Sequence, residues 1–418
     1  MKTILSILGA LIGAALMFGV GFYVSQFLFK EDVPPPPPPD YFSETSGGSR
    51  ADLTGGDQKI VEVRDGESIR NAVADAEPGT IIRVYPGRYN ETIFIDKDFK
   101  IMNYKGNGIM GQAGNNFVIR NNWVKDAGIY GIFPEYGKNG LIEHNIISGI
   151  ADAAIYVGMC DNIDVRYNEV HDNVAGIEIE NSRKVLVEGN YAHNNAGAIF
   201  ALITPGLPIK NCRNVIFRSN YVINNNHENF GEPGSIVGKL PKGTGIIVLA
   251  ADKVTMENNI VMGNDNVGIA VTDLSFTDNM DKDPKTDPYP DSLVILDNLM
   301  ANNGNNPVGQ VKTLGKARMS YKGLDILAMG GGKGSCIKDR SRYRTWGLDG
   351  YGACPPTTTT GIQSYMLDKP AEPRDVDKER EGKLVYYGVC SGCHAYDTRL
   401  IGPKVTDIQK IRADQQAR

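Results

Sequence analysis

The chain has 418 residues, a length that suggests two or three domains. Its net charge of −5 argues against a nucleic-acid-binding protein, because such proteins carry a basic surface. The 48 glycines and a dense scatter of asparagines indicate many turns, and therefore a mainly β architecture rather than a helical bundle.

Residues 1–30 contain an apolar segment, Ile4 to Phe29, that is long enough to span a bilayer. Lys2 and the amino terminus lie before this segment. After it, Glu31 and Asp32 offset Lys30. This bias predicts a single-pass anchor in the cytoplasmic membrane, with the bulk of the chain in the periplasm or outside the cell. A cleaved signal peptide is the alternative.

Residues 31–58 are predicted to be a linker. Its six consecutive prolines, Pro34 to Pro39, favour polyproline II, which makes a stiff spacer of roughly 3.1 Å per residue. Beyond the linker, residues 66–78 have apolar side chains at helical spacing and are followed by a strand from Thr80 to Tyr85. An amphipathic helix here would cap the first coil of a repeated fold.

Residues 59–325 repeat with a period of about 22 residues. The marker of the repeat is an asparagine, preceded by a short alternating strand such as Ile163–Val165 and often followed by another, clearest in Ala175–Glu180. The asparagines recur at spacings of 23, 23, 22, 30, 39 and 39 residues: Asn122, Asn145, Asn168, Asn190, Asn220, Asn259 and Asn298.

Two or three short strands per period of this length predict a right-handed parallel β-helix, a mainly β fold in which coils stack about 4.8 Å apart. The longer spacings indicate loop insertions. We expect the recurrent asparagine to lie at a turn with left-handed φ, where its side-chain amide bonds to its neighbours along the axis.

Two stretches, DAAIYVGMCDNIDVRYNEVHDNVAGIEIENS and GTGIIVLA, resemble the pectate-lyase-like superfamily of right-handed parallel β-helices. The resemblance covers residues 130–273 and is greatest to the repeat proteins encoded beside a dihaem c-type cytochrome. It implies export and an association with cytochrome chemistry.

Many proteins of this fold bind or cleave polysaccharides, which makes a carbohydrate-active protein the alternative function. Asp152, Asp164, Glu178 and Glu180 are expected to face outward, and in that alternative they would line a shallow groove. Arg166 lies close to Asp164 in sequence, but no catalytic set follows from the pattern. Alternating outward charge is also typical of any solvated strand.

The cysteines and histidines of the repeat fall into two columns. Cys160, Ser182 and Cys212 each lie eight residues before their asparagine. The two cysteines are therefore two coils apart, beyond the reach of a disulfide, and we expect them to be buried filler side chains. His171 and His193 should stack on adjacent coils. They are either solvent-exposed side chains of the turns or a pair that holds a metal ion or senses pH.

Residues 326–375 are predicted to be a Gly-rich irregular segment outside the repeat. In an oxidising compartment Cys336 and Cys354 are expected to pair. The loop that such a disulfide closes would stabilise the fold by about 3 kcal/mol.

Residues 376–418 contain the string Cys390-Ser391-Gly392-Cys393-His394. The CxxCH pattern predicts one covalent haem c, with thioethers at Cys390 and Cys393 and with His394 as an iron ligand. A zinc half-site would need a further Cys or His pair nearby, and a dithiol redox motif would need a βαβ context; neither is present.

The stretch GKLVYYGVCSGCHAYDTRLIGPKVTDI resembles the first half of a class I monohaem cytochrome c. In that family the Gly-Pro loop orients the proximal histidine. No methionine or second histidine follows His394. Three explanations stay open: the chain is cut short, the sixth ligand is Met329, Met366 or a partner's residue, or the iron is five-coordinate.

These patterns together predict a membrane-anchored c-type cytochrome that transfers electrons in the periplasm or at the surface, a carrier rather than an enzyme. The β-helix would be a scaffold or a docking surface for a redox partner, such as another c-type cytochrome, or for a glycan. The alternative is a carbohydrate-binding or carbohydrate-active β-helix, lyase-like or epimerase-like, with an accessory haem.

Overall fold

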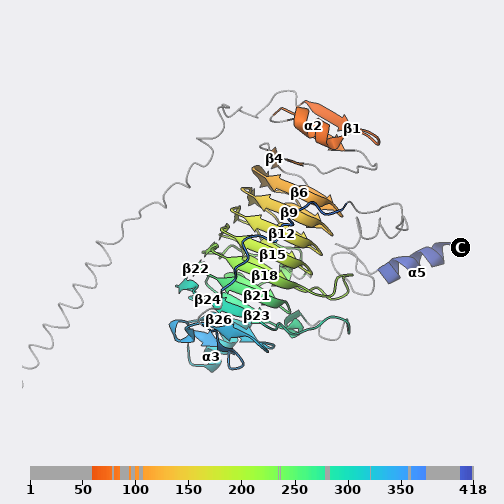
Figure 1. Ribbon diagram of the computed structural model, residues 1–418. Coiled ribbons are helices and arrows are strands. Elements are labelled where there is room, and N and C mark those ends of the chain that lie inside the picture. The colour runs from red at the N-terminus through yellow and green to blue at the C-terminus, as the bar shows by residue number, and fades with distance from the viewer. Residues whose placement is uncertain are drawn as a thin grey trace, which may run out of the picture. The chain divides into compact units, whose positions relative to one another are not determined.

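The computed structural model in Figure 1 describes residues 59–77, 80–84, 94–95, 99–102, 107–233, 235, 237–277, 283–320, 322–355, 359–372 and 405–416. Most of the described strands pair in parallel in three sheets, and successive strands along the chain go to sheet 1, sheet 2 and sheet 3 in turn. Each circuit of the three sheets is one coil of a parallel β-helix. The predicted fold class is therefore confirmed for this part of the chain.

The strands of sheet 1 are β3 (Phe94–Ile95), β6 (Asn115–Arg120), β9 (Lys138–Glu143), β12 (Asp161–Arg166), β15 (Arg183–Glu188), β18 (Arg213–Arg218), β21 (Asp252–Glu257), β24 (Val294–Leu296), β27 (Cys336–Ile337) and β29 (Gly352–Ala353). Those of sheet 2 are β4 (Phe99–Met102), β7 (Asn122–Lys125), β10 (Ile146–Ser148), β13 (Glu169–His171), β16 (Tyr191–His193), β19 (Tyr221–Ile223), β22 (Ile260–Met262) and β25 (Leu299–Ala301). Those of sheet 3 are β5 (Ile109–Gln112), β8 (Ile132–Glu135), β11 (Ala153–Gly158), β14 (Ala175–Glu180), β17 (Gly197–Leu202), β20 (Thr244–Leu249), β23 (Val267–Thr272), β26 (Leu324–Met329) and β28 (Thr345–Trp346).

The core is built from aliphatic columns that run along the helix axis. Alternation along β14 sends Ile177 and Ile179 inward and Glu178 and Glu180 outward, as the sequence predicts. The register stacks like residues on one another, so that each coil buries the layer of the next. One column of sheet 3 consists of seven fully buried isoleucines: Ile132, Ile155, Ile177, Ile199, Ile246, Ile269 and Ile326.

The recurrent asparagines form a buried ladder at the turn from sheet 1 to sheet 2. The side-chain oxygen of Asn168 accepts hydrogen bonds from the main-chain N–H (3.0 Å) and the side-chain amide (2.9 Å) of Asn145, and the pattern continues from Asn122 to Asn298. Each amide also donates to a main-chain carbonyl, as Asn168 does to Ile142. From Asn145 to Asn298 the side-chain oxygen and the amide of each ladder asparagine both have partners, so these turns are held in register.

Two details of the turns differ from the sequence prediction. The left-handed φ lies on the residue before each asparagine, for example 55° at His144 and 53° at Tyr167, and not on the ladder asparagine. A second buried ladder lies at the turn from sheet 2 to sheet 3: Asn173, Asn195, Asn225, Asn264 and Asn303. In the sequence, each asparagine of this second ladder lies five residues after the first-ladder asparagine of the same coil. The sequence prediction overlooked this second set.

The long spacings are loop insertions, as predicted. One insertion, residues 203–212, follows β17, and another, residues 226–243, precedes β20 and contains η1 (Val237–Lys239). A third, residues 273–293, follows β23 and begins with η2 (Leu274–Thr277). The first and third are joined, because Lys210 pairs with Asp283 at 2.5 Å.

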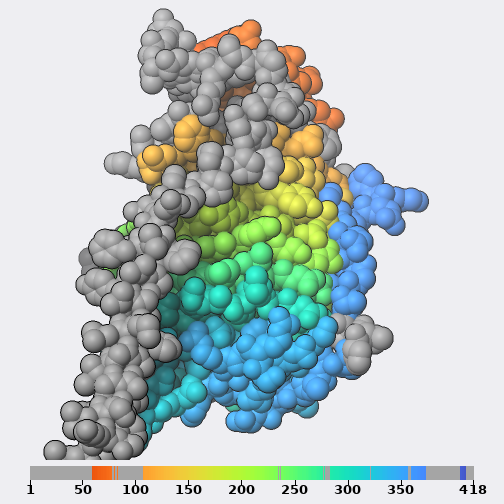
Figure 2. All heavy atoms as spheres, turned by 90° about the vertical axis from the view of Figure 1, so that its left-hand side faces the viewer, coloured from red at the N-terminus to blue at the C-terminus, as the bar shows by residue number. Residues whose placement is uncertain are grey.

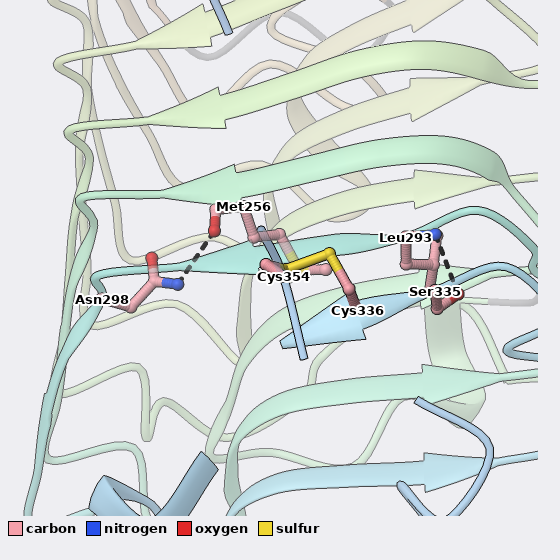
Figure 3. Close-up of a disulfide and its surroundings, with 6 residues drawn as sticks. All are labelled: Met256, Leu293, Asn298, Ser335, Cys336 and Cys354. Atoms are coloured by element: carbon pink, nitrogen blue, oxygen red, sulfur yellow. Dashed lines mark hydrogen bonds between the residues drawn. A yellow bond between two sulfur atoms is a disulfide. The ribbon is translucent and has the colours of Figure 1, made fainter. Parts of the chain in front are cut away.

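The β-helix does not end at residue 325. The strands β26, β27, β28 and β29 continue sheets 1 and 3, so part of the predicted irregular segment consists of further coils. Cys336 on β27 and Cys354 just after β29 form a disulfide, the pair expected from the sequence (Figure 3). The loops of these coils contain α3 (Gly309–Ala317), which packs Val311 against Leu324, and η3 (Arg340–Arg342).

Outside the coils, α2 (Ile69–Asp75) lies where the sequence predicts a helix, with Ser68 as its N-cap, and β1 (Ile60–Val63) pairs with β2 (Ile81–Val84). The helix α5 (Val405–Gln416) is the described part of the C-terminal segment. No helix of the described residues is long and apolar enough to cross a membrane. The predicted anchor, Ile4 to Phe29, and the linker lie outside the described residues.

Candidate functional site

The outer face of sheet 3 holds a cluster of buried acidic and aromatic side chains. The register places Tyr156, Glu178 and Phe200 side by side in one outward column. In the next column Glu180 lies beside Gly158, which in turn lies beside Glu135 of β8. These side chains point away from the aliphatic core, yet Glu135, Glu178 and Glu180 are only 0%, 4% and 7% exposed.

The insertions bury this face from two sides. Val237 and Leu240 of the loop at 226–243 join the core cluster that contains Phe200. Leu207 of the loop at 203–212 packs against Tyr136 and Met159, on the side where the strands of sheet 3 end. These inserted loops therefore help to exclude water from the acidic cluster.

Glu180 is held by two hydroxyl groups. Tyr156 donates a hydrogen bond to its Oε2 and Thr204 donates one to its Oε1. The Tyr156 ring can lie along the sheet because Gly158 has no side chain; a Cβ at Gly158 would approach the ring to 2.3 Å. Burial raises the pKa of Glu180, and the two hydroxyl donors oppose this by stabilising its ionised form.

Glu178 has the opposite environment. Its Oε2 is buried and has no hydrogen-bond partner in the protein. Burial, followed by the nearby Asp152 and Glu180 carboxyls, raises the pKa of Glu178 well above its ordinary value. The same causes, burial first and then Glu180, raise the pKa of Asp152, which directly precedes β11 and keeps part of its surface exposed. The protonated forms of Glu178 and Asp152 are favoured.

Aromatic rings line the cluster on the side of the earlier coils. The rings of Tyr130 and Phe133 lie 4.5 Å and 4.8 Å from the ring of Tyr156, measured between centroids. Glu135 accepts a hydrogen bond of 2.7 Å from Gln112 of β5. The arrangement combines a carboxyl with a raised pKa, a hydrogen-bonded carboxyl and apolar ring faces, which are the groups needed for acid–base chemistry on a polar, ring-shaped substrate.

The structure brings together three of the four acidic residues that the sequence predicts for one groove. Asp152, Glu178 and Glu180 gather on sheet 3. Asp164 does not: it lies on β12 of sheet 1, where it pairs with Arg166 at 2.8 Å. The sequence prediction was wrong here because outward positions of sheets 1 and 3 have the same alternating pattern, although the two sheets face different directions.

The sequence prediction also missed Tyr156 and Thr204. Tyr156 lies 22 residues before Glu178, at the same position of the preceding coil, so the repeat phase could have found it. Thr204 lies in an inserted loop, where the repeat does not predict the position of a residue. Within the described residues, no set of three or more His, Cys, Asp or Glu side chains is arranged to hold a metal ion.

The two other columns are as expected. Cys160 and Cys212 are buried free thiols, and Cys160 accepts a hydrogen bond from Gly137. The rings of His171 and His193 stack at 5.1 Å between centroids, and each also contacts a carboxylate: His171 lies 2.7 Å from Asp172, and His193 lies 3.1 Å from Glu169.

The predicted haem ligands Cys390, Cys393 and His394 lie outside the described residues. The two methionines considered as sixth ligands lie on different faces of the β-helix. Met329 ends β26 of sheet 3 and packs against an apolar cluster, whereas Met366 belongs to an extended segment over sheet 1.

Comparisons with known proteins identify the fold. The sequence matches the family model described as a right handed beta helix region over residues 69–204 and 107–279, which together span half of the chain. No curated relative matches it.

Three solved structures illustrate the similarity. The periplasmic alginate epimerase AlgG is 21% identical, with 59% of this chain and 51% of that chain covered and a TM-score of 0.39. A DFA-IIIase from Arthrobacter chlorophenolicus A6 in complex with GF2 is 13% identical, with 73% and 66% covered and a TM-score of 0.35. The A-module of the Azotobacter vinelandii mannuronan C-5 epimerase AlgE4 is 13% identical, with 67% and 77% covered and a TM-score of 0.31. The chain spans about half the length of the alginate epimerase AlgG, and the likeness concerns the fold alone.

Proposed function

This chain belongs to the right-handed β-helix family, and we propose that it binds a glycan and acts on it at the outer face of sheet 3. The observation that carries the proposal is Glu178: a carboxyl that is 4% exposed, has an unpartnered oxygen and lies beside two more carboxyls. A protein that used this face only for packing would gain stability from an apolar residue at this position. Perturbed carboxyls of this kind are typical of active sites.

The two glutamates have environments suited to different roles. Glu178, whose pKa is raised by burial and by its acidic neighbours, is the proton donor. Glu180, whose ionised form is stabilised by Tyr156 and Thr204, is the proton acceptor. Such a pair supports proton transfer at a sugar ring, which glycoside hydrolysis, β-elimination and epimerisation all need. Asp152, which is partly exposed, marks the side from which a saccharide would approach.

The test is turnover of a panel of acidic and neutral polysaccharides, including alginate and fructans, by the full chain and two variants. Glu178→Gln keeps the shape of the side chain but cannot supply the proton, and we expect a loss of at least 100-fold in kcat/KM. Glu188→Gln, a glutamate on sheet 1, is the matched control and should keep the activity. Turnover unchanged in Glu178→Gln would contradict the proposed role.

A second function is proposed from the sequence motif at residues 390–394: covalent attachment of one haem c for electron transfer to a redox partner. Two thiols and an imidazole are the donor set that this group requires, with Cys390 and Cys393 bonding the porphyrin and His394 the iron. The haem, when bound, would supply one-electron chemistry.

A pyridine haemochrome spectrum of protein matured with haem, compared with a Cys390→Ala/Cys393→Ala variant, tests the attachment. Absence of covalent haem from the unaltered chain would rule it out. The proposed anchor at Ile4 to Phe29 is tested separately, by fractionation of the full chain between membrane and soluble fractions.

A further inference from the structure

Residues 359–372, here named the clasp, lie extended along the outer face of sheet 1 (Figure 1; Figure 2, blue). The clasp follows the last coil but runs back toward the first ones. Thr360 contacts Glu257 of β21, Tyr365 contacts Asp164 of β12, and Ala371 contacts Asn116 of β6. It therefore crosses five coil steps, about 24 Å at about 4.8 Å per step.

Side chains of sheet 1 bind the main chain of the clasp. The amide of Asn162 donates to the Tyr365 carbonyl (2.9 Å), and Asp164 accepts from the Tyr365 N–H (2.9 Å). Asn116 pairs with both main-chain groups of Ala371, accepting at 2.7 Å and donating at 2.8 Å. Recognition through main-chain groups is the way in which proteins hold extended peptides with little regard to their sequence.

The binding asparagines form a column that crosses the coils. Asn116, Asn139 and Asn162 occupy equivalent positions of β6, β9 and β12, with left-handed φ of 57°, 62° and 59°. The same column continues at Lys184, Asn214 and Lys253, with φ of 54°, 56° and 50°. The backbone therefore does not demand asparagine at this column, and the three that contact the clasp are used for their amides.

The surface under the clasp offers hydrogen-bond donors and apolar side chains to a bound peptide. Arg218 donates to the Ile362 carbonyl at 2.8 Å, and Arg166 donates to the Gln363 carbonyl. Leu186 and Ile216 share the outward face with Asp164 and are 0% and 2% exposed. Apolar residues on an outward face stay dry only if something covers them, and the clasp spans these coils.

We propose that the outer face of sheet 1 is a binding surface for an extended peptide and that its ligand is this chain's own clasp. Binding returns the described chain from the last coils to β6, where Asn115 donates to the Glu372 carbonyl at 2.9 Å. The proposal depends on neither the glycan nor the haem function, because it rests on the contacts of residues 359–372 alone.

The experiment uses the full chain with a protease site in place of residues 356–358, under non-reducing conditions. After cleavage the Cys336–Cys354 disulfide does not hold residues 359–418 to the coils, because Cys354 lies before the cut. We expect the fragment to stay with the β-helix through gel filtration. In Asn116→Gly/Asn139→Gly/Asn162→Gly, four hydrogen bonds to the clasp are lost, and retention should weaken on the order of a hundredfold.

The matched control is Lys184→Gly/Asn214→Gly/Lys253→Gly, which places glycine at left-handed positions of the same column, and it should retain the fragment. Release of the fragment from the unaltered nicked chain, or equal release from both triple variants, would overturn the proposal. Retention only in a dimer, with the fragment supplied by a second copy, would overturn its assignment to the chain's own clasp.

Discussion

The outer faces of sheets 1 and 3 both bury carboxylates, but in opposite environments. On sheet 1, Asp164 pairs with Arg166 and accepts hydrogen bonds from the clasp, and Glu188 pairs with Arg218 at 2.7 Å. On sheet 3, Glu178 has neither an arginine nor a donor for its Oε2. Because a buried carboxyl without a partner is unfavourable, the paired sheet 1 carboxylates serve the fold, whereas Glu178 on sheet 3 is the one to expect in chemistry.

Asp164→Ala should have the largest effect on stability. It removes the buried carboxylate that pairs with Arg166 and accepts from the Tyr365 N–H, and we expect the free energy of unfolding to fall by about 3–4 kcal/mol. Chemical denaturation measures this change. A loss below about 1 kcal/mol would mean that the clasp and Asp164 contribute little, and the contrast between the faces would fail.

The disulfide should come next, because it fixes the end of sheet 1 just before the clasp. The variant Cys336→Ser/Cys354→Ser should lose about 2–3 kcal/mol, since the unfolded chain regains the freedom of an 18-residue loop. Denaturation of the unaltered chain with and without reductant is the control, and both comparisons should agree. If neither changes the midpoint, the last coils do not depend on this bond.

The same substitution on the two faces should have opposite signs. Glu178→Met removes a desolvated carboxyl and should stabilise the protein at pH 8 by about 1–2 kcal/mol, whereas Glu188→Met removes the closer of the two carboxylates that pair with Arg218 and should destabilise it. Thermal unfolding of both variants decides the matter. Stabilisation by both, or by neither, would remove the distinction between the faces.

The pH dependence of stability sharpens this contrast. The pKa of Glu178 is raised in the folded state, so above the ordinary pKa of 4.5 the unfolded chain releases a proton that the folded protein retains. Stability should therefore fall as pH rises from about 4.5 toward the folded-state pKa. Glu178→Met should flatten this part of the profile, and an identical slope in both proteins would contradict the raised pKa.

The smallest effect is expected for Arg120→Ala. Arg120 lies on sheet 1 in the same column as Arg166, but it is half exposed and 3.6 Å from Glu143. Exposed pairs contribute little because water screens them, and we expect a change below about 0.5 kcal/mol in unfolding. A larger loss would show that the whole charged column, and not only its covered part, stabilises the face.

The sequence by itself determined the coil. The asparagine spacing fixed the period, the alternation of β14 fixed which residues face inward, and the column of Cys160 and Cys212 followed from the same phase. These features are local or strictly periodic, so they can be predicted from the order of residues without knowledge of the tertiary contacts. The second asparagine ladder has the same phase and could have been found in this way.

Only the tertiary structure decided which outward carboxylates have partners. Asp164 and Glu178 have the same alternating surroundings in sequence, but residues 359–372, about two hundred positions away, bind the first. The loops at 203–212 and 226–243 instead pack into the apolar clusters on the sheet that carries the second. Periodicity specifies the direction of a side chain and not what lies above it. Segments outside the repeat determine the covering, because their contacts depend on where the folded chain brings them.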